Sequence, residues 1–427
     1  MRPEMTKPWL KSSWIIDSLE EAKLLIALLE TSEKSYDLEV VLSCREIGRI
    51  AKLSMDEAWY LGRLFKENGI ACFLQWDILM TENVFVSTSV TLKSKGLFSK
   101  DFPFSGIRVQ DAGALYWLKD NNFPKNIHYI CENGNHNISA LKGWYGFWPE
   151  RISRLVLSPE LTASTLREYR DKLECELEVL AWGPLLLFYT PRGLLSPQFG
   201  DSENTSEDLR VLGTSEESPH RGFPLIENSH GTFMFNTKDQ FSLGDWSLMK
   251  EVSEGSSFHW RFDFSDFNDK CGLYKVVLEL FSELVEGEHL NEKVITELLS
   301  KLKVLGPRPV IKGFFKTNKT DVLFKKLKNS RLQDRTDTYI GDIVDVKKKK
   351  YLGLHLKSPT LILKKGNRVR LLSPEGNEKL VVVNSLRNAV LEEVDEVTFG
   401  DVAFISHVGG ISVRTMAYLD TPDTPMA

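Results

Sequence analysis

Short apolar runs alternate with amphipathic segments between about Trp14 and Leu180. Ser18-Leu-Glu-Glu21 and Ser54-Met-Asp-Glu57 have the spacing of capping boxes, and each opens a segment with apolar residues three and four positions apart. The apolar runs have the length of buried strands and are Leu38–Leu42, Ala71–Trp76, Gly106–Val109, Ile127–Cys131, Leu155–Leu157 and Leu177–Ala181. Buried strands that alternate with helices predict parallel strands joined by crossover helices. This number of repeats favours a closed or partly closed (β/α) barrel.

Beyond about Gly306 the pattern changes to short strands separated by tight turns at Gly366, Gly376 and Gly400. The apolar runs there are Tyr339–Val346, Thr360–Leu363, Arg368–Leu372, Lys379–Val383 and Asp401–Ile405. This spacing predicts a small antiparallel β-barrel. The fold class is therefore α/β, with a (β/α) barrel-like domain over residues 1–300 and the small barrel over residues 301–427. The length of 427 residues agrees with two domains, because it exceeds the size at which a single core usually stops growing.

Residues 198–220 interrupt this order with a polar, acidic stretch that has almost no apolar periodicity. Such a composition buries too little surface to offset the entropy of ordering, so we expect a mobile loop. A functional lid and a solvated insertion both remain open, and the composition favours the insertion.

Composition and charge limit the classes of function. The chain has no apolar run of the roughly 20 residues that cross a bilayer and no signal-peptide order at its N-terminus, so we expect a cytoplasmic protein without membrane contact. Its five cysteines form no close pair, which indicates free thiols. The chain carries a net charge of −5, yet from about Lys301 onward it has a surplus of about nine positive charges. The C-terminal part is therefore the more plausible polyanion binder.

The usual catalytic signatures are missing from the sequence. There is no HExxH, no Walker loop, no GxGxxG after a strand and no GxSxG elbow. Among the dispersed histidines only His128 and His136 lie near each other, and spacing alone assembles no Ser-His-carboxylate set. The sequence thus identifies neither a nucleophile nor a metal site.

The stretch from Lys172 to Ser196 resembles the cluster-binding segment of peptidase family U-32, the collagenase-like proteases and their RNA- and quinone-hydroxylating relatives. Gly183, Tyr189, Arg192 and the run Leu194-Leu195-Ser196 fall on matching family positions. Two family cysteines fall on Leu186 and Gly193, and a family histidine falls on Trp182.

Further fragments resemble the family in the same order along the chain. The matched polar residues are Arg45, Asp111, Asn133, Glu160, Asn236, Lys238 and Asp239. Pro159 stands where the family has arginine, and Cys131-Glu132 stands where it has Ser-Thr. The resemblance also implies that the C-terminal barrel is similar to the translation-factor-like barrel of transfer-RNA hydroxylation proteins.

The resemblance implies a site at the carboxyl ends of the strands, where a (β/α) barrel carries its chemistry. The predicted pocket residues are Arg45, Asp111, Asn133, Glu160, Trp182, Tyr189, Arg192, Asn236, Lys238 and Asp239. The alternative is that Asp111, Glu160 and residues 236–239 cap helices and close loops. Many members hold a four-iron cluster on four thiolates. With Leu186 and Gly193 in two ligand positions, we expect no iron–sulfur cluster, no other cofactor and no metal.

Two classes of function remain open. One is a cluster-less relative in transfer- or ribosomal-RNA hydroxylation that binds substrate or assists a cluster-containing paralogue. The other is a peptidase or hydrolase, as the collagenase-like family name implies. Lys347, Lys348, Lys349 and Lys350 form a predicted hairpin tip that is either a solvated turn or a contact for RNA phosphates.

Overall fold

A computed structural model describes the chain over residues 9–420 apart from 33, 133–134, 200–207, 216–217, 255–257, 287–290, 317–337, 374–377 and 414. The chain divides into two compact units, residues 1–317 and residues 318–427. Among the described residues no helix combines the length and the apolar character that crossing a membrane requires.

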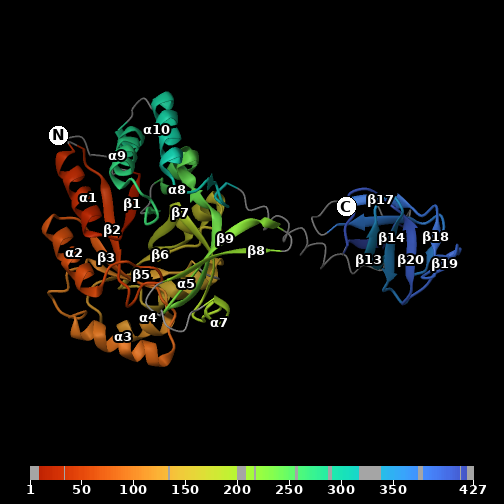
Figure 1. Ribbon diagram of the computed structural model, residues 1–427, viewed down its shortest axis with the longest axis horizontal. Helices are drawn as coiled ribbons and strands as arrows, with labels where there is room; N and C mark the ends of the chain where they lie inside the picture. Colours follow the sequence, from red (N-terminus) through yellow and green to blue (C-terminus); the bar gives the residue numbers. More distant parts are fainter. Residues whose placement is uncertain are drawn as a thin grey trace. The chain divides into compact units, whose positions relative to one another are not determined.

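The first unit is a closed parallel barrel, as the alternating pattern predicts (Figure 1). Its strands are β1 (Lys11–Ile16), β2 (Asp37–Ser43), β3 (Cys72–Trp76), β4 (Gly106–Val109), β5 (Asn126–Ile130), β6 (Ile152–Val156), β7 (Glu176–Thr190) and β11 (Phe258–Asp263). Strand β11 pairs in parallel with both β7 and β1, and this pairing closes the ring. All six predicted apolar runs lie in or overlap barrel strands, so the barrel prediction is confirmed.

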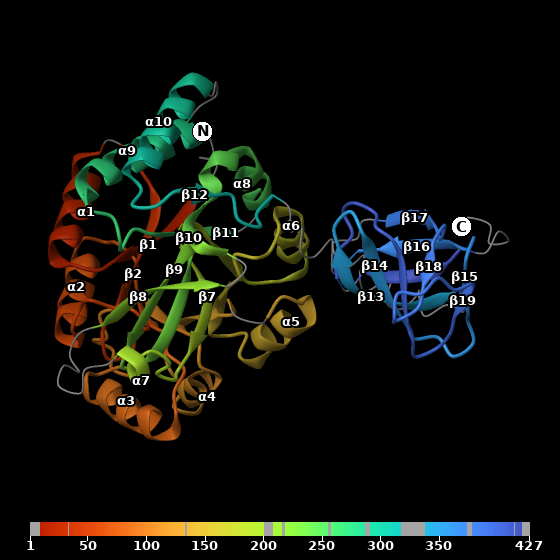
Figure 2. The same ribbon diagram turned by 45° about the vertical axis from the view of Figure 1, so that its right-hand side comes forward.

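Helices cover the outside of the barrel (Figure 2). They are α1 (Leu19–Thr31), α2 (Met55–Glu67), α3 (Glu82–Ser94), α4 (Ala112–Asp120), α5 (Ile138–Phe147), α6 (Ala163–Lys172), α8 (Trp246–Ser253), α9 (Lys270–Glu286) and α10 (Glu292–Leu305), with a 3-10 turn at Ser242–Asp245. Apolar side chains that alternate along the strands pack against these helices in one core; Trp14, Leu42, Leu74 and Trp260 are examples. The opposite side chains of the same strands face the barrel interior, and many of them are polar, including Ser13, Glu39, Arg108 and Arg154.

The two predicted capping boxes differ in the structure. Ser54 forms the complete box with Glu57, and the helix that it opens ends at Asn68 and Gly69, as predicted. Ser18 caps α1 by accepting the Glu21 N–H, but the Glu21 carboxylate accepts from the backbone of Asp17 instead of returning to Ser18. The helix start was therefore predictable, whereas the partner of Glu21 was not.

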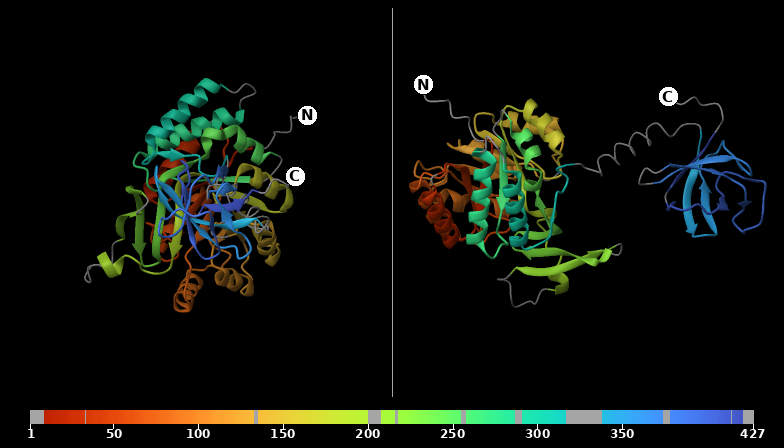
Figure 3. Two further views of the ribbon diagram at one scale, coloured as in Figure 1. Left: turned by 90° about the vertical axis from the view of Figure 1, so that its right-hand side faces the viewer. Right: turned by 90° about the horizontal axis from the view of Figure 1, so that it is seen from above.

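An antiparallel extension interrupts the barrel between β7 and β11. Strand β7 continues past the barrel rim and pairs with β10 (Gly231–Phe241), which pairs with β9 (Ser218–Asn228), and β9 pairs with β8 (Leu209–Ser215). The hairpin of β8 and β9, in yellow-green, projects from the barrel (Figure 3). Residues 209–215 and 218–220 of the predicted mobile loop lie in these strands, so the prediction is corrected there, whereas residues 200–207 and 216–217 lie outside the described residues. Pairing with neighbouring strands supplies the backbone hydrogen bonds that an acidic composition does not reveal.

The second unit is an antiparallel half-barrel, as the short runs predict. Its strands are β13 (Tyr339–Lys347), β14 (Tyr351–Leu356), β15 (Leu363–Lys364), β16 (Arg368–Leu372), β17 (Glu378–Val382), β18 (Leu386–Arg387), β19 (Glu396–Val397), β20 (Val402–Ser406) and β21 (Met416–Leu419). The expected boundary at residue 301 lies inside α10, and the following strand β12 (Val310–Ile311) pairs with β10, so this segment belongs to the first unit.

The capping box at Ser54 gives a test of the barrel's local stability. We expect Ser54→Ala to lower the free energy of unfolding by about 0.5–2 kcal/mol, because an N-terminal amide of α2 loses its acceptor. Urea unfolding followed by tryptophan fluorescence measures this change in the first unit alone, since all ten tryptophans precede residue 318.

Ser87→Ala is the matched control for this substitution. Ser87 is exposed in the interior of α3, where alanine is the better helix former, so its replacement is expected to cause no loss of stability. Equal stability of the Ser54 variant and the wild type would contradict the role of the box.

Candidate functional site

A cavity of about 550 Å³ opens where the barrel strands end. Its floor comes from residues at or just beyond the carboxyl ends of strands: Ser43, Gln75, Asp77, Gln110, Glu132, Ser158, Arg261 and Asp263. Its apolar wall comes from the extension of β7 and β10, through Leu186, Leu187, Phe188, Phe233 and Phe235. Both the volume and the mixture of apolar walls with a few polar groups are typical of small-molecule sites.

Two arginines bridge the acidic groups on the cavity floor. Arg49 donates from Nε to Asp77 at 2.6 Å and from its backbone N–H to the other Asp77 oxygen at 2.9 Å. Its Nη2 lies 3.3 Å from Glu132, whose second oxygen is paired with Arg261. Burial by itself would raise the pKa of Glu132, but Arg261 and Arg49 together hold it below its ordinary value. The floor is thus an alternating chain of charges.

Several polar atoms of the cavity floor have no protein partner in the described part of the chain. They are Ser43 Oγ, Arg49 Nη1, Gln110 Oε1 and Arg261 Nε, each buried. A buried polar group without a hydrogen bond is costly, so these atoms favour water or a polar ligand in the cavity.

Below the cavity the barrel interior holds a network of charges centred on Glu178. Arg108 binds both Glu178 oxygens, at 2.7 and 2.6 Å, and Arg154 lies 3.1 Å from one of them. Arg154 also pairs with Glu39 and with Glu176. Burial by itself would raise the pKa of Glu178, but the guanidiniums of Arg108, Arg154 and Arg261 bring it well below its ordinary value. The Glu178 carboxylate therefore stays ionised.

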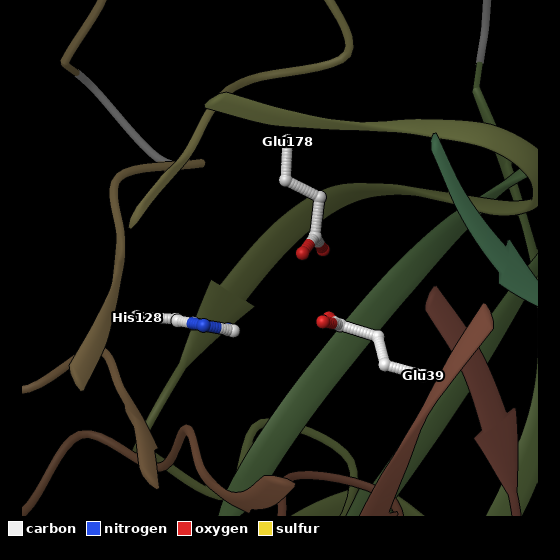
Figure 4. A group of neighbouring side chains, drawn as sticks. All are labelled: Glu39, His128 and Glu178. Carbon is white, nitrogen blue, oxygen red and sulfur yellow. The ribbon is translucent and has the colours of Figure 1, made fainter. Parts of the chain in front are cut away.

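Glu39, His128 and Glu178 point toward one another inside the barrel, and their ligand atoms lie within 4.8 Å of one another (Figure 4). This grouping does not suit a metal ion. Both carboxylates already accept from arginine, and a cation would lie beside the guanidiniums of Arg108 and Arg154. Burial and these two arginines lower the pKa of His128 well below its ordinary value, and its ring stacks on Phe73. We interpret His128 as a neutral interior residue.

Of the described residues that the resemblance predicts for the pocket, Glu160 and Tyr189 line the cavity. The Tyr189 hydroxyl accepts from the Leu79 N–H at 2.9 Å and donates to the carbonyl of His230 at 3.3 Å, which ties the apolar wall to the loop after β3. Asp111 instead caps α4 by accepting the Ala114 N–H, as the alternative reading proposes. Asn133 lies outside the described residues.

Three predicted residues lie away from the cavity wall. Arg45 is exposed, and its carbonyl accepts from the ring of His230, while Arg49 is the arginine that reaches the cavity. Arg192 is also exposed. Trp182 is fully buried among Phe241, Phe264 and Phe267, so it is a core residue.

The segment Asn236–Asp239 does not face the cavity either. Asn236 accepts the Lys238 N–H where β10 is out of register with β7, and Lys238 is exposed. Asp239 caps no helix: it is fully buried on β10 and pairs at 2.7 Å with Arg308 in the loop between α10 and β12, as the loop-closing alternative proposes. Burial raises its pKa despite this partner.

Sequence reasoning missed Arg49, Asp77, Glu132 and Arg261. A signal was present, because Asp77, Glu132 and Arg261 lie within or directly after apolar strands, where a solvated charge is unexpected. The sequence did not show that these residues meet at one site, because they come from segments up to 212 residues apart.

The residues present do not fit a four-thiolate cluster. Leu186 and Gly193 offer no ligand atom, and Leu186 is an apolar wall residue of the cavity. Among the cysteines, Cys44, Cys72 and Cys131 are buried, Cys175 is partly buried and Cys271 is exposed. Burial raises the thiol pKa of Cys175 to about 12, so this thiol is protonated at neutral pH in the absence of a metal.

Comparisons with known proteins give consistent matches. Residues 63–321, more than half of the chain, match peptidase family U32. The chain is 22% identical over 359 residues to tRNA hydroxylation protein P of Haemophilus influenzae, covering 70% of this chain and 72% of that protein.

Similar solved structures include the U32 peptidase Mk0906, which is 14% identical with a TM-score of 0.31 and covers 43% of this chain and 72% of its own. Another is the C-terminal domain of a putative U32 peptidase from Geobacillus thermoleovorans, which is 10% identical with a TM-score of 0.18 and covers 20% of this chain and 93% of its own.

The Glu178 network gives a sharp test of the barrel interior. Glu178→Gln leaves the buried arginines without their shared counter-charge, so we expect a loss of about 3–5 kcal/mol in the free energy of unfolding. Because the pKa of Glu178 is lower in the folded than in the unfolded state, its contribution is complete above about pH 4.3 and is lost as pH falls through the folded value. The difference in the free energy of unfolding between variant and wild type should be constant from about pH 5 to 8 and should become smaller in stronger acid.

Glu160→Gln makes the same chemical change at an exposed position. Its side chain is 48% exposed beside His136, so a change below about 1 kcal/mol is expected. If urea unfolding gave similar losses of unfolding free energy for Glu178→Gln and Glu160→Gln, the stabilising role of the interior network would be contradicted.

Proposed function

The chain belongs to peptidase family U32, and from that premise we propose that it is a cluster-less member that binds substrate or assists a partner in the hydroxylation of transfer or ribosomal RNA. The observation that carries this proposal is the cavity at the barrel mouth. It keeps the size and polar floor of a ligand site, while Leu186 and Gly193 remove two positions that would hold a redox cluster. The similarity to tRNA hydroxylation protein P supports RNA modification as the setting.

The geometry gives less support to a peptidase. Ser43 and Ser158 line the cavity, but in the described part of the chain neither hydroxyl is hydrogen-bonded to a histidine. His136 lies 3.7 Å from Glu160, so a base and a carboxylate are present without an activated nucleophile. Binding therefore explains the cavity better than covalent catalysis does.

The basic turn of the second unit is the surface that we propose for RNA. Residues 347–350 form the turn between β13 and β14, as predicted, and all four lysines are exposed. Within the described residues none of them has an ion-pair partner, so their charge is available to phosphates. We also propose a cluster-containing paralogue as a partner, because Leu186 and Gly193 supply no thiolate for a redox centre in this chain.

We expect the full chain, purified without oxygen, to contain far less than one iron and one sulfide per molecule. Two of the four thiolate positions are filled by Leu186 and Gly193, and half of the ligand shell is too little for a four-iron cluster. Iron and sulfide analysis with visible absorption spectroscopy checks this before and after reconstitution, with a relative that retains the four cysteines as the positive control. A stoichiometric cluster in this chain would overturn the cluster-less reading.

We expect the full chain to bind unmodified transfer or ribosomal RNA with an affinity that falls steeply as salt rises, because lysine contacts release condensed counterions. Lys348→Glu with Lys349→Glu should weaken binding at least about tenfold at low salt and flatten the salt dependence. Lys23→Glu with Lys66→Glu makes the same change of net charge on exposed helix positions of the first unit and should have less effect. Fluorescence anisotropy at several salt concentrations measures both.

A deletion strain completes the test of function. Mass spectrometry of its RNA should show less of one hydroxylated nucleoside, and the wild-type gene should restore it. Unchanged nucleosides, no RNA binding at low salt, and peptide release that disappears in an Arg49→Ala variant would instead establish the hydrolase.

A further inference from the structure

The segment between β7 and α7 (Ser196–Phe199) folds around one carboxylate. Glu227 of β9 accepts the backbone N–H of Leu194 at 2.6 Å and of Leu195 at 2.7 Å on one oxygen, and that of Ser196 at 2.8 Å on the other. Glu227 is only 6% exposed. Three successive amides that converge on one anion form a nest, an arrangement that stabilises negative charge.

Thr232 on β10 completes this arrangement. Its hydroxyl lies 2.6 Å from Glu227 and 2.8 Å from the carbonyl of Arg192, and it accepts the Leu194 N–H at 3.0 Å. The hydroxyl has one hydrogen, so it donates to either the carboxylate or the carbonyl. Residues 192–196 are thus held from β9 and β10 together.

Gly193 lies directly against this carboxylate. A Cβ at this position would lie 3.2 Å from Glu227 Oε1 and 2.9 Å from Ser196 Oγ. The backbone of Gly193 is outside the left-handed region, so its conformation does not demand glycine. The neighbouring side chains are what leave little room, and a thiolate there would also place a second anion beside Glu227.

This contact concerns the segment that resembles a cluster-binding segment, because Gly193 and Leu186 fall where the resemblance has two cysteines. Leu186 pairs with Phe235 across β7 and β10 and contributes to the apolar cavity wall. Leu186 therefore forms part of the apolar cavity wall, and Gly193 leaves space for the buried carboxylate of Glu227.

We propose that Glu227 replaces the cluster as the group that holds residues 192–196 in place, so that this segment keeps its fold with an internal anion instead of a metal centre. The proposal concerns how the segment is held and does not depend on RNA as the substrate. It also explains why glycine at position 193 accompanies a buried glutamate at position 227, since any side chain at position 193 would compete with Glu227 for the same space.

Hydrogen–deuterium exchange of the full chain, read at Leu194, Leu195 and Ser196, tests this directly. In Glu227→Ala these amides lose a charged acceptor and should exchange at least about tenfold faster, while amides of β2 to β5 should change little. Glu227→Gln keeps one acceptor oxygen and should give a smaller increase, which serves if the alanine variant does not fold. Glu254→Ala, an exposed glutamate of the same unit, is the control and should leave these amides unchanged.

A second cycle tests the shared space. Gly193→Ala alone should speed exchange at residues 194–196, because its methyl group meets Glu227; in the Glu227→Ala background the same change should add little. Protection should also be equal for protein from iron-replete and iron-depleted cultures. Unchanged exchange in both Glu227 variants, or protection that rises with iron, would overturn the proposal.

Discussion

The first unit depends on the ionised carboxylate of Glu178 inside a ring of parallel strands. Barrels of this kind usually fill their interior with branched apolar side chains, but here Arg108 and Arg154 meet Glu178 at hydrogen-bonding distance. The pairs of Arg261 with Glu178 and Glu132, and of Arg49 with Glu132 and Asp77, extend the network to the cavity floor. Because each buried charge needs its partners, the strands that carry them are held in one register. The apolar core lies outside the strands, against the helices, and leaves the interior free to build a polar site.

The same constraint shapes the chemistry of the cavity. Its arginines are already paired, so they present directed donors such as Arg49 Nη1 rather than a free positive field. The wall formed by β7 and β10 adds apolar surface, which Tyr189 anchors to the loop after β3. A ligand there would gain orientation from the floor and burial from the wall, which suits binding better than attack by a nucleophile. Glu132, which stands where the resemblance has threonine, is the residue that links the two arginines.

The extension of β7 is held together by one buried carboxylate. Glu227 receives three backbone amides and lies beside Gly193, so the segment has a complete set of partners. Burial alone would raise the pKa of this carboxyl, but hydrogen bonds from Leu195, Thr232 and Ser196 lower it to about 2. The carboxylate is therefore ionised at neutral pH, and an anion held by amides does not depend on redox state or iron supply.

Features that arise from neighbouring residues were predictable from the sequence. Apolar strands alternating with helices indicated the barrel, Ser18 and Ser54 marked helix starts, and the lysines at 347–350 marked a turn. Matched family positions also indicated Tyr189 and Glu160, which do line the cavity. Which charged residues pair is visible only in the tertiary structure. Asp239 pairs with Arg308, 69 residues away, and Glu132 pairs with Arg261, 129 residues away. The tertiary structure also made strands of residues 209–215 and 218–228, because pairing along β10 and β9 supplies hydrogen bonds that composition does not encode. Local patterns fix where elements begin and end, whereas the partners of a buried charge depend on strand register, which only the closed barrel establishes.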